Sequence, residues 1–269
     1  MSNEDGKAES FTPLTFGAAK HGAIVLQQKY TKCTKRRECP PVFLVIYLKK
    51  APKSQSGPHR ISLMHPVRPF PIECSPDHPP IVFVTGEAAT WQAAFDKPSK
   101  LGSIKLKAIS ISMLKKKFTT RKSRDEMLST TPIFFCEHAA ASVLPSRLGS
   151  QFFSRNKQPI IVTLDINDSD QIFNEIKKAT ECSELYVKQD KKLMMRVGAF
   201  NFTFDHLGEN ITDAADQAIK IIPKGKKYVE SMCLMSSGIE TKPIWERNPK
   251  IIQLTAEDLV TKSNEDADD

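Results

Sequence analysis

The sequence lacks the glycine-rich and catalytic motifs by which many nucleotide-binding proteins and hydrolases are recognised. The segment VTGEAAT at 84–90 has one glycine where a dinucleotide-binding turn needs three, and nothing matches GxxxxGK[ST] or GxSxG. The six histidines, at 21, 59, 65, 78, 138 and 206, are scattered along the chain. These absences predict a protein that is not an enzyme and that has no cofactor and no bound metal.

The compact group Cys136-Glu137-His138 combines three reactive residue types. Successive residues of a strand point to opposite faces, so Cys136 and Glu137 are poorly placed to act together. We interpret them as a buried thiol followed by a surface acid at the end of a strand. An enzymatic function would need an active site that the sequence does not reveal.

Disulfide, zinc and membrane signals are also missing. The six cysteines, at 33, 39, 74, 136, 182 and 233, form no CxxC pair and fit no common zinc framework. The longest apolar run, VFLVIYL at 42–48, is too short to span a bilayer, and the opening MSNEDGKAES is polar with mixed charge. We therefore expect reduced thiols and a location in the cytosol or nucleus.

Acidic residues are absent from 97–124, a segment that holds ten of the basic residues. The whole chain has a net charge of +8, a balance that favours polyanionic partners. A run of like charge is often only a solvated face, yet this one would also attract RNA phosphates through release of counterions. The last residues, 263–269, form an acidic tail instead.

Strand-like and helix-like segments alternate along the chain. The pattern predicts strands at 42–48, 81–85, 109–114, 133–136, 160–166, 194–200 and 228–235. Helices are predicted at 17–32, 170–180 and 209–222, the last with Asn210 as its N-cap and Pro223 beyond its end. Ten of the 18 prolines fall between 40 and 80, where they mark connections. This alternation predicts α/β layers, with an excursion that leaves one domain and returns to it.

Two long segments resemble the ribosomal L1 domain family. RVGAFNFTFDHLGENITDAADQAIKIIP, followed by KYVESMCLMSSGIETKPIW, resembles the closing half of L1 proteins. PIFFCEHAAASVLPSRLGSQFFSRNKQPIIVTL is similar to a segment of the eukaryotic nucleolar L1-domain assembly factors, with matches at Leu144, Pro145, Leu148, Gly149, Phe152 and Pro159. The segments FLVIYLKKAP and ISLMHPVRP are similar to the family's first strand and its proline-linked extension. The resemblance covers roughly residues 17–245.

This resemblance implies a two-domain α/β (α+β) fold. Domain I would be a discontinuous, RNA-binding split β-α-β domain formed by 1–75 and 156–262, and domain II an inserted three-layer α/β domain at 76–155. The chain departs from the family pattern at Glu137-His138-Ala139, at Met235, where a lysine is usual, and at Lys242-Pro243-Ile244-Trp245. These departures bear on the exact RNA contacts more than on the fold.

The resemblance also implies an RNA site on one face of domain I. Small residues let a phosphodiester approach the backbone, while basic side chains supply the salt-sensitive attraction. The implied RNA-binding residues are Lys49, Lys50, Lys188, Lys191, Lys192, Arg196, Gly198, Ser236, Ser237 and Gly238. A secondary basic patch comprises Lys105, Lys107, Lys115, Lys116, Lys117, Arg121, Lys122 and Arg124. Each of these residues also has a simpler explanation that does not involve RNA, since lysines at strand ends aid solubility and glycines allow turns.

The implied function is non-catalytic binding of rRNA or pre-rRNA by a ribosome assembly factor. It would act in the nucleolus as a monomer within pre-ribosomal particles, beside other assembly proteins and away from membranes. One alternative is a large-subunit ribosomal protein of the L1 stalk. Another is a protein-protein scaffold of a ribonucleoprotein that has lost direct RNA binding.

Overall fold

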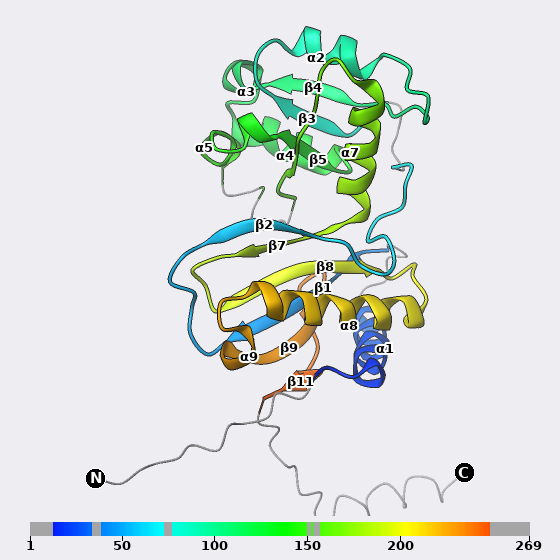
Figure 1. Cartoon of the computed structure of the whole chain (residues 1–269), viewed down its shortest axis with the longest axis vertical. Coiled ribbons are helices and arrows are strands. Elements are labelled where there is room, and N and C mark those ends of the chain that lie inside the picture. The colour runs from blue at the N-terminus through cyan, green and yellow to red at the C-terminus, as the bar shows by residue number, and fades with distance from the viewer. Residues whose placement is uncertain (1–12, 34–38, 73–76, 150–151, 153–156, 248–269) are drawn as a thin grey trace, which may run out of the picture.

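The computed structural model describes residues 13–33, 39–72, 77–149, 152 and 157–247, and it confirms the predicted α/β class. An antiparallel sheet and a parallel sheet stand at opposite ends of this described part, with a two-stranded ribbon between them (Figure 1). The predicted acidic tail at 263–269 lies outside the described residues. No helix among the described residues is long and apolar enough to cross a membrane.

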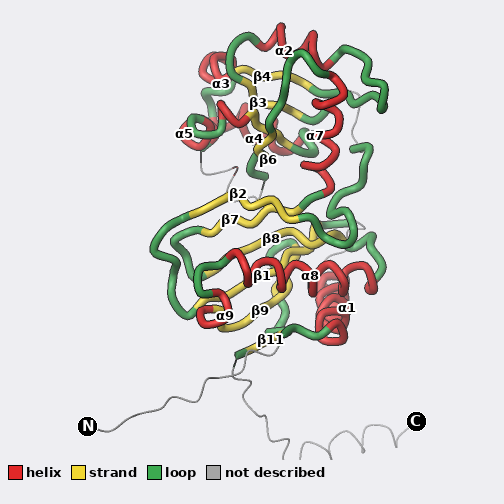
Figure 2. The backbone as a smooth tube through the Cα atoms, viewed as in Figure 1, coloured by secondary structure: helices red, strands yellow, loops and turns green. Residues whose placement is uncertain are grey.

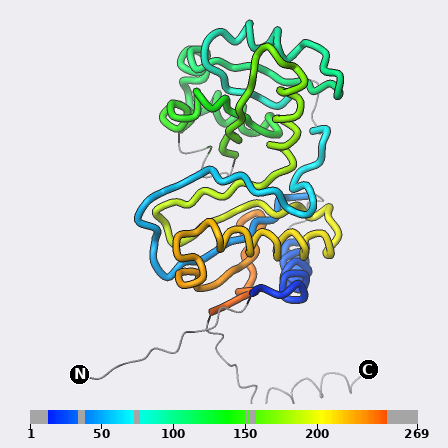
Figure 3. Tube along the Cα trace, viewed as in Figure 1, coloured from blue at the N-terminus to red at the C-terminus, as the bar shows by residue number. Residues whose placement is uncertain are grey.

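The antiparallel sheet is built around β1 (Pro41–Leu48), the segment that contains the longest apolar run. β1 pairs with β8 (Lys192–Ala199) on one side and with β9 (Val229–Ser236) on the other. β10 (Ile239–Glu240) and β11 (Trp245–Glu246) add short antiparallel pairings to β9. Strands far apart in the sequence, drawn in blue and orange in Figure 3, thus lie side by side.

Helices α1 (Phe16–Cys33) and α8 (Phe204–Ile221) pack on one face of this sheet. Ile211, Ala214, Ala215 and Ala218 of α8 are fully buried, as their helical spacing predicts. The predicted start of α8 is wrong, because Thr203 is the N-cap and accepts from His206 N. Asn210 lies inside the helix and is buried, so its side chain serves another contact.

The two-stranded ribbon joins β2 (Ser56–Ile61) to β7 (Ser183–Val187) in antiparallel register. It lies between the two sheets, as Figure 2 shows with strands in yellow. Leu185 and Val187 are buried in the same core as the antiparallel sheet. The short α9 (Gly225–Tyr228) leads from α8 into β9.

The parallel sheet has the order β4 (Lys107–Ser110), β3 (Ile81–Val84), β5 (Phe134–Glu137) and β6 (Ile160–Val162). Its buried residues alternate between two cores. α2 (Ala88–Phe95) and α7 (Ser169–Glu181) pack on one face, and α3 (Ile111–Lys117), α4 (Arg121–Thr130) and α5 (Leu144–Leu148) pack on the other. A 3₁₀ turn, η1 (His138–Ala140), follows β5. The result is a three-layer arrangement.

Two of the predicted strands are too long. The strand predicted at 109–114 ends at Ser110, whose hydroxyl accepts from Met113 N and so caps α3. The strand predicted at 160–166 ends at Val162. A serine within an apolar run, such as Ser110, can end a strand or begin a helix. The apolar content of the run does not distinguish these two outcomes.

The chain returns from the parallel sheet later than the sequence suggests. β6 pairs with β5, and Ile172, Ile176 and Ala179 of α7 are buried in the core beside β3 and β5. Residues 157–181 therefore pack with the parallel sheet, whereas a boundary after 155 assigns them to domain I. The sequence could not locate this boundary, because the apolar face of α7 could pack against either sheet and only the tertiary structure shows which one it covers.

Candidate nucleic-acid interface

The face of the antiparallel sheet opposite α1 and α8 presents aromatic, sulfur-containing and basic side chains. Leu44 and Ile46 point into the helix-covered core, so the alternating residues of β1 point the other way. We call this surface the open face. Its residues are Phe43, Val45 and Tyr47 of β1, Lys192, Met194 and Arg196 of β8, and Cys233 and Met235 of β9. All of these except Val45 and Cys233 are half-buried.

At one end of the open face, Tyr47, Lys192 and Glu240 form a polar cluster. Tyr47 Oη donates to Glu240 Oε1 at 2.7 Å, and Lys192 Nζ lies 3.1 Å from Glu240 Oε2 and 5.3 Å from the centroid of the Tyr47 ring. Burial works against ionisation of Glu240, but the hydrogen bonds from Tyr47 and Lys192 hold its pKa below the ordinary value. The charge of Lys192 is thus partly neutralised within the protein.

The turn at the other end follows β9 directly. Ser237 and Gly238 both have positive φ, 48° and 81°, and they connect β9 to β10 as the two central residues of a tight hairpin. Ser237 and Gly238 are exposed, and a Cβ added to Gly238 would meet no atom within 4 Å. Ser236 is instead buried, and its hydroxyl donates to the Pro41 carbonyl at 2.9 Å. Only Ser237 and Gly238 of the predicted triplet are open to a ligand.

Gly198 is placed against the core rather than at an RNA surface. A Cβ added there would lie 2.8 Å from Leu207 Cδ2 and 3.1 Å from Phe202 Cδ2. Gly198 is also buried on β8. Its missing side chain therefore allows α8 to approach the sheet, and its predicted role in contacting RNA is corrected to one in packing.

Arg196 borders a cavity of about 520 Å³ between the two sheets. The cavity is also lined by Arg68, Lys157, Ser237 and Gly238. Arg68 was not among the predicted site residues, although it stands in the quoted segment ISLMHPVRP. The structure thus brings Arg196 and the hairpin turn together, and it adds two cations from distant parts of the chain.

Three of the five predicted lysines gather at the far end of β1. Leu48 N donates to the Lys191 carbonyl and Lys49 N to the Tyr228 carbonyl, both at 2.8 Å. Lys49, Lys50 and Lys191 are exposed there, joined by Lys226 and Lys227 of α9. We call these five the lysine end. β1 has eight residues, and a strand of that length spans about 25 Å, so this group is separate from Arg196 and the hairpin turn.

The signal for Lys226 and Lys227 is present in the sequence as KGKKY, directly after the helix. These two lysines become part of the site only because α9 folds back beside β1, through the contact between Lys49 N and the Tyr228 carbonyl. Lys49 and these two lysines lie far apart in the sequence, so the sequence alone does not reveal that they are close in the structure.

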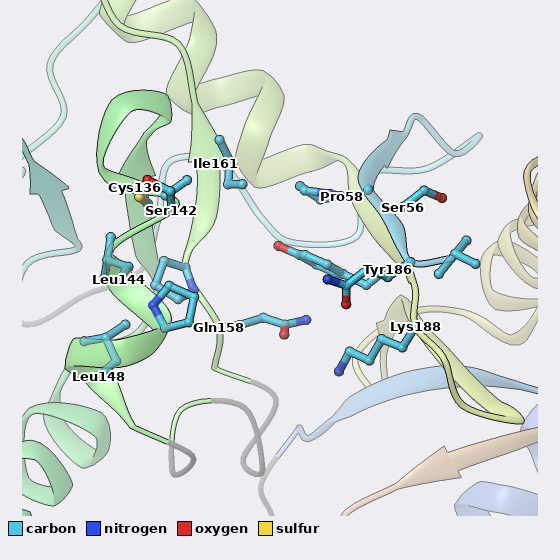
Figure 4. Close-up of a pocket in the computed structure, with 16 residues that line it drawn as sticks. Ser56, Pro58, Cys136, Ser142, Leu144, Leu148, Gln158, Ile161, Tyr186 and Lys188 are labelled. Atoms are coloured by element: carbon cyan, nitrogen blue, oxygen red, sulfur yellow. The ribbon is translucent and has the colours of Figure 1, made fainter. Parts of the chain in front are cut away.

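Lys188 points into a second cavity, of about 690 Å³, shown in Figure 4. Tyr186 and Lys188 line one side of it, and Cys136, Leu144 and Leu148 line the other, with Gln158 between them. Burial raises the pKa of Cys136 to about 12, so this thiol is held in its unreactive protonated form. Glu137 Oε2 accepts hydrogen bonds from Thr85 N and Oγ1 at 2.8 and 2.7 Å. Cys136 is thus buried, as predicted, whereas Glu137 is half-buried and hydrogen-bonded to Thr85 and is not the solvated surface acid that the sequence suggested.

The predicted secondary patch lies on the part of the molecule built around the parallel sheet. Lys115, Lys116 and Lys117 end α3, Arg121, Lys122 and Arg124 begin α4, and Lys105 and Lys107 lie at or beside the edge strand β4. Most of these side chains are exposed. Arg121 pairs loosely with Asp125 at 3.8 Å, and Arg124 Nη1 donates to the Arg147 carbonyl at 3.4 Å. The patch is therefore a separate basic surface, on a different sheet from the open face.

Among the described residues, no group of histidine, cysteine or acidic side chains is arranged to hold a metal ion. The arginines at the cavity and the exposed lysines of the lysine end offer hydrogen-bond donors and positive charge. Such an arrangement suits binding of an anionic, aromatic polymer.

Residues 25–238 match the model of the ribosomal protein L1p/L10e family. A protein of Schizosaccharomyces pombe (strain 972 / ATCC 24843), named "Putative ribosome biogenesis protein C8F11.04", is 24% identical over 208 residues, which cover 76% of this chain and 54% of that protein. The chain thus spans about half the length of this curated relative. Since the family model matches most of the sequence, the chain belongs to the ribosomal protein L1p/L10e family.

Proposed function

We propose that this protein binds rRNA or pre-rRNA without catalysis and acts as a ribosome assembly factor in nucleolar pre-ribosomal particles. Family membership and the name of the fission-yeast relative support a role connected with ribosomes. In this proposal the antiparallel part is the RNA-binding domain and the parallel part is the inserted domain. The protein acts as a monomer within a larger ribonucleoprotein, next to other assembly proteins.

The single observation that carries RNA binding is the open face with positive charge at both ends. Phe43 and Tyr47 offer half-buried rings on which bases stack, as in other sheet-based RNA-binding surfaces. The lysine end and Arg196 lie at opposite ends of the same sheet and attract the sugar-phosphate backbone. The exposed Ser237–Gly238 turn lets a strand approach the backbone of the protein.

Fluorescence anisotropy with structured rRNA fragments tests this proposal directly. We expect binding that weakens as salt rises, with a steep linear dependence of log K on log[salt], because lysine and arginine side chains displace counterions. Combined substitution of Phe43→Ala and Tyr47→Ala should weaken binding by about 1–3 kcal/mol for each lost base stack. Lys220→Gln, on the exposed side of α8, tests separately whether loss of one positive charge away from the open face changes RNA binding. Absence of binding at low salt would refute RNA binding and favour a protein scaffold.

Sucrose-gradient sedimentation distinguishes an assembly factor from a stalk protein. We expect the protein to sediment with pre-ribosomal particles and to be absent from cytoplasmic polysomes. The LPSRLGSQF segment and Met235 favour this outcome, because both depart from the pattern of the ribosomal protein itself. Persistent presence in polysomes would contradict the assembly role while leaving RNA binding intact.

A further inference from the structure

The described part of the chain ends beside the lysine end. Arg247, its last residue, directly follows β11. The backbone N–H of Arg247 donates to the Glu230 carbonyl and its Nε to the Val229 carbonyl, both at 2.9 Å, while its Nη2 donates to the Lys226 carbonyl of α9. The chain therefore continues toward its acidic tail from a point next to α9.

The lysine end carries positive charge that the described residues do not pair. All five of its side chains are exposed. Within the described ranges, none of the five takes part in an ion pair. Asp190 and Glu230 are the acidic residues that adjoin this group in the sequence, so the lysines outnumber them. A surface of this kind attracts an acidic group.

The acidic tail at 263–269 has the complementary charge. It contains no basic residue, and its four acids are Glu265, Asp266, Asp268 and Asp269. Glu265 stands 18 positions after Arg247, and a chain of that length can reach at most about 60 Å. Because the tail and the lysine end belong to one chain, their effective concentration is about millimolar, at which several weak ion pairs together give binding.

The secondary basic patch is a less suitable partner for the tail, because it is farther away. Helices α3 and α4 lie at the opposite end of the described part from α9 and β11 (Figure 1). Binding there would require a more extended connection, which costs more chain entropy and lowers the effective concentration. Charge and distance together favour the lysine end.

We propose that the acidic tail binds the lysine end of its own chain, with its carboxylates paired to the exposed ammonium groups, and that a polyanion must displace it. The docking itself does not depend on the proposed RNA binding. Displacement by RNA does rest on that proposed function. A tail of this kind makes the protein selective, because an RNA segment with few phosphate contacts does not displace it.

Docking is measured without RNA, from the rates at which the lysines of the full chain are acetylated by an amine-reactive reagent. The tail variant combines the substitutions Glu265→Gln, Asp266→Asn, Asp268→Asn and Asp269→Asn. At low salt, we expect the lysine end to react about threefold faster in the tail variant than in the wild type, because ion pairs protect the amines. At high salt the rates should be equal, because salt screens the pairs. Lys115, Lys116 and Lys117 of α3 are the internal reference and should react equally in both proteins.

Three results would overturn this docking. The first is equal reactivity of the lysine end in the wild type and the tail variant. The second is the same acceleration at α3, which would indicate a general effect of net charge. The third is protection that increases with protein concentration, which would place the tail on the lysine end of a second copy.

RNA affinity tests displacement separately. At low salt, the tail variant should bind RNA about threefold more tightly than the wild type, and the difference should vanish at high salt. The tail substitutions should have a smaller effect on RNA affinity in a protein that also carries Lys226→Gln and Lys227→Gln. Their effect should persist in a protein with Lys115→Gln and Lys116→Gln instead.

The two measurements distinguish the two parts of the inference from the proposed function. Protection of the lysine end with unchanged RNA affinity in the tail variant would overturn displacement, while docking would stand. Protection in a wild type that binds no RNA would support docking and refute the proposed RNA binding alone.

Discussion

Asn210, in the middle of α8, is hydrogen-bonded to both backbone polar groups of His65. Its Oδ1 accepts from His65 N at 2.8 Å, and its Nδ2 donates to the His65 carbonyl at 3.0 Å. The same Nδ2 donates to the Val197 carbonyl of β8 at 2.9 Å. One buried amide thus joins the helix, the sheet and the connection after β2. An asparagine in a helix interior is explained here by tertiary contacts.

Replacing Asn210 with alanine should lower the free energy of unfolding by about 2–4 kcal/mol, because the change leaves buried backbone groups of His65 and Val197 without partners. Urea unfolding followed by circular dichroism measures the loss. Asp216→Ala, at an exposed position of the same helix, is the control and should change stability little. Equal effects of the two substitutions would mean that the hydrogen bonds of Asn210 contribute nothing.

Alanine at Gly198 should destabilise the protein by about 1–2 kcal/mol, because its Cβ would crowd Leu207 and Phe202. RNA affinity of the folded protein should stay unchanged, since this position faces the core. Denaturant unfolding and RNA titration of one preparation separate the two effects. A variant with normal stability and weakened RNA binding would restore the original prediction that Gly198 contacts RNA.

The stability of the protein should depend on Glu184 between pH 4.5 and 7. Burial is the main cause that raises the pKa of this carboxyl to about 7 from 4.5, so the folded state holds the proton more tightly than the unfolded state. The resulting stability is fully present below pH 4.5 and is lost as pH rises through 7. The loss amounts to at most about 3 kcal/mol for a shift of this size.

Glu184→Gln removes this titration while keeping the shape of the side chain. We expect the unfolding free energy of E184Q relative to the wild type to rise steadily from pH 4.5 to 7 and then level off. Urea denaturation at half-unit pH steps measures the difference, with Glu126→Gln at an exposed site of α4 as control. A difference that is independent of pH would show that Glu184 titrates normally.

Charge removal at the lysine end should weaken RNA binding uniformly across RNA sequences. The double substitution Lys226→Gln and Lys227→Gln removes two exposed charges of α9, and each lost phosphate contact should reduce the salt slope by about 0.7–0.9. Affinity measured at several salt concentrations gives the slope. Lys115→Gln with Lys116→Gln, at the end of α3, removes the same charge from the other sheet. A similar loss in both double variants would locate RNA on both basic surfaces.

The sequence by itself determined the elements with the clearest apolar pattern, whereas β2, β7 and the helices from α2 to α5 were not predicted. The apolar spacing of Ile211, Ala214 and Ala218 placed the buried face of α8, and the run VFLVIYL placed the central strand. Motif order indicated the L1 family, to which the chain belongs. These features depend on neighbours within a few residues, so side-chain period and propensity are sufficient to find them.

Only the tertiary structure decided which of the predicted residues lie together. Lys49 directly follows β1, and Arg196 lies on the neighbouring β8, but antiparallel pairing puts them at opposite ends of the sheet. Arg68 and Arg196, in contrast, line one cavity although 128 positions separate them in the sequence. Gly198 packs against α8, and the hydroxyl of Ser236 is hydrogen-bonded to the Pro41 carbonyl. The physical reason is that register and packing between distant segments, set by the burial of whole faces, determine which polar groups remain available to a ligand.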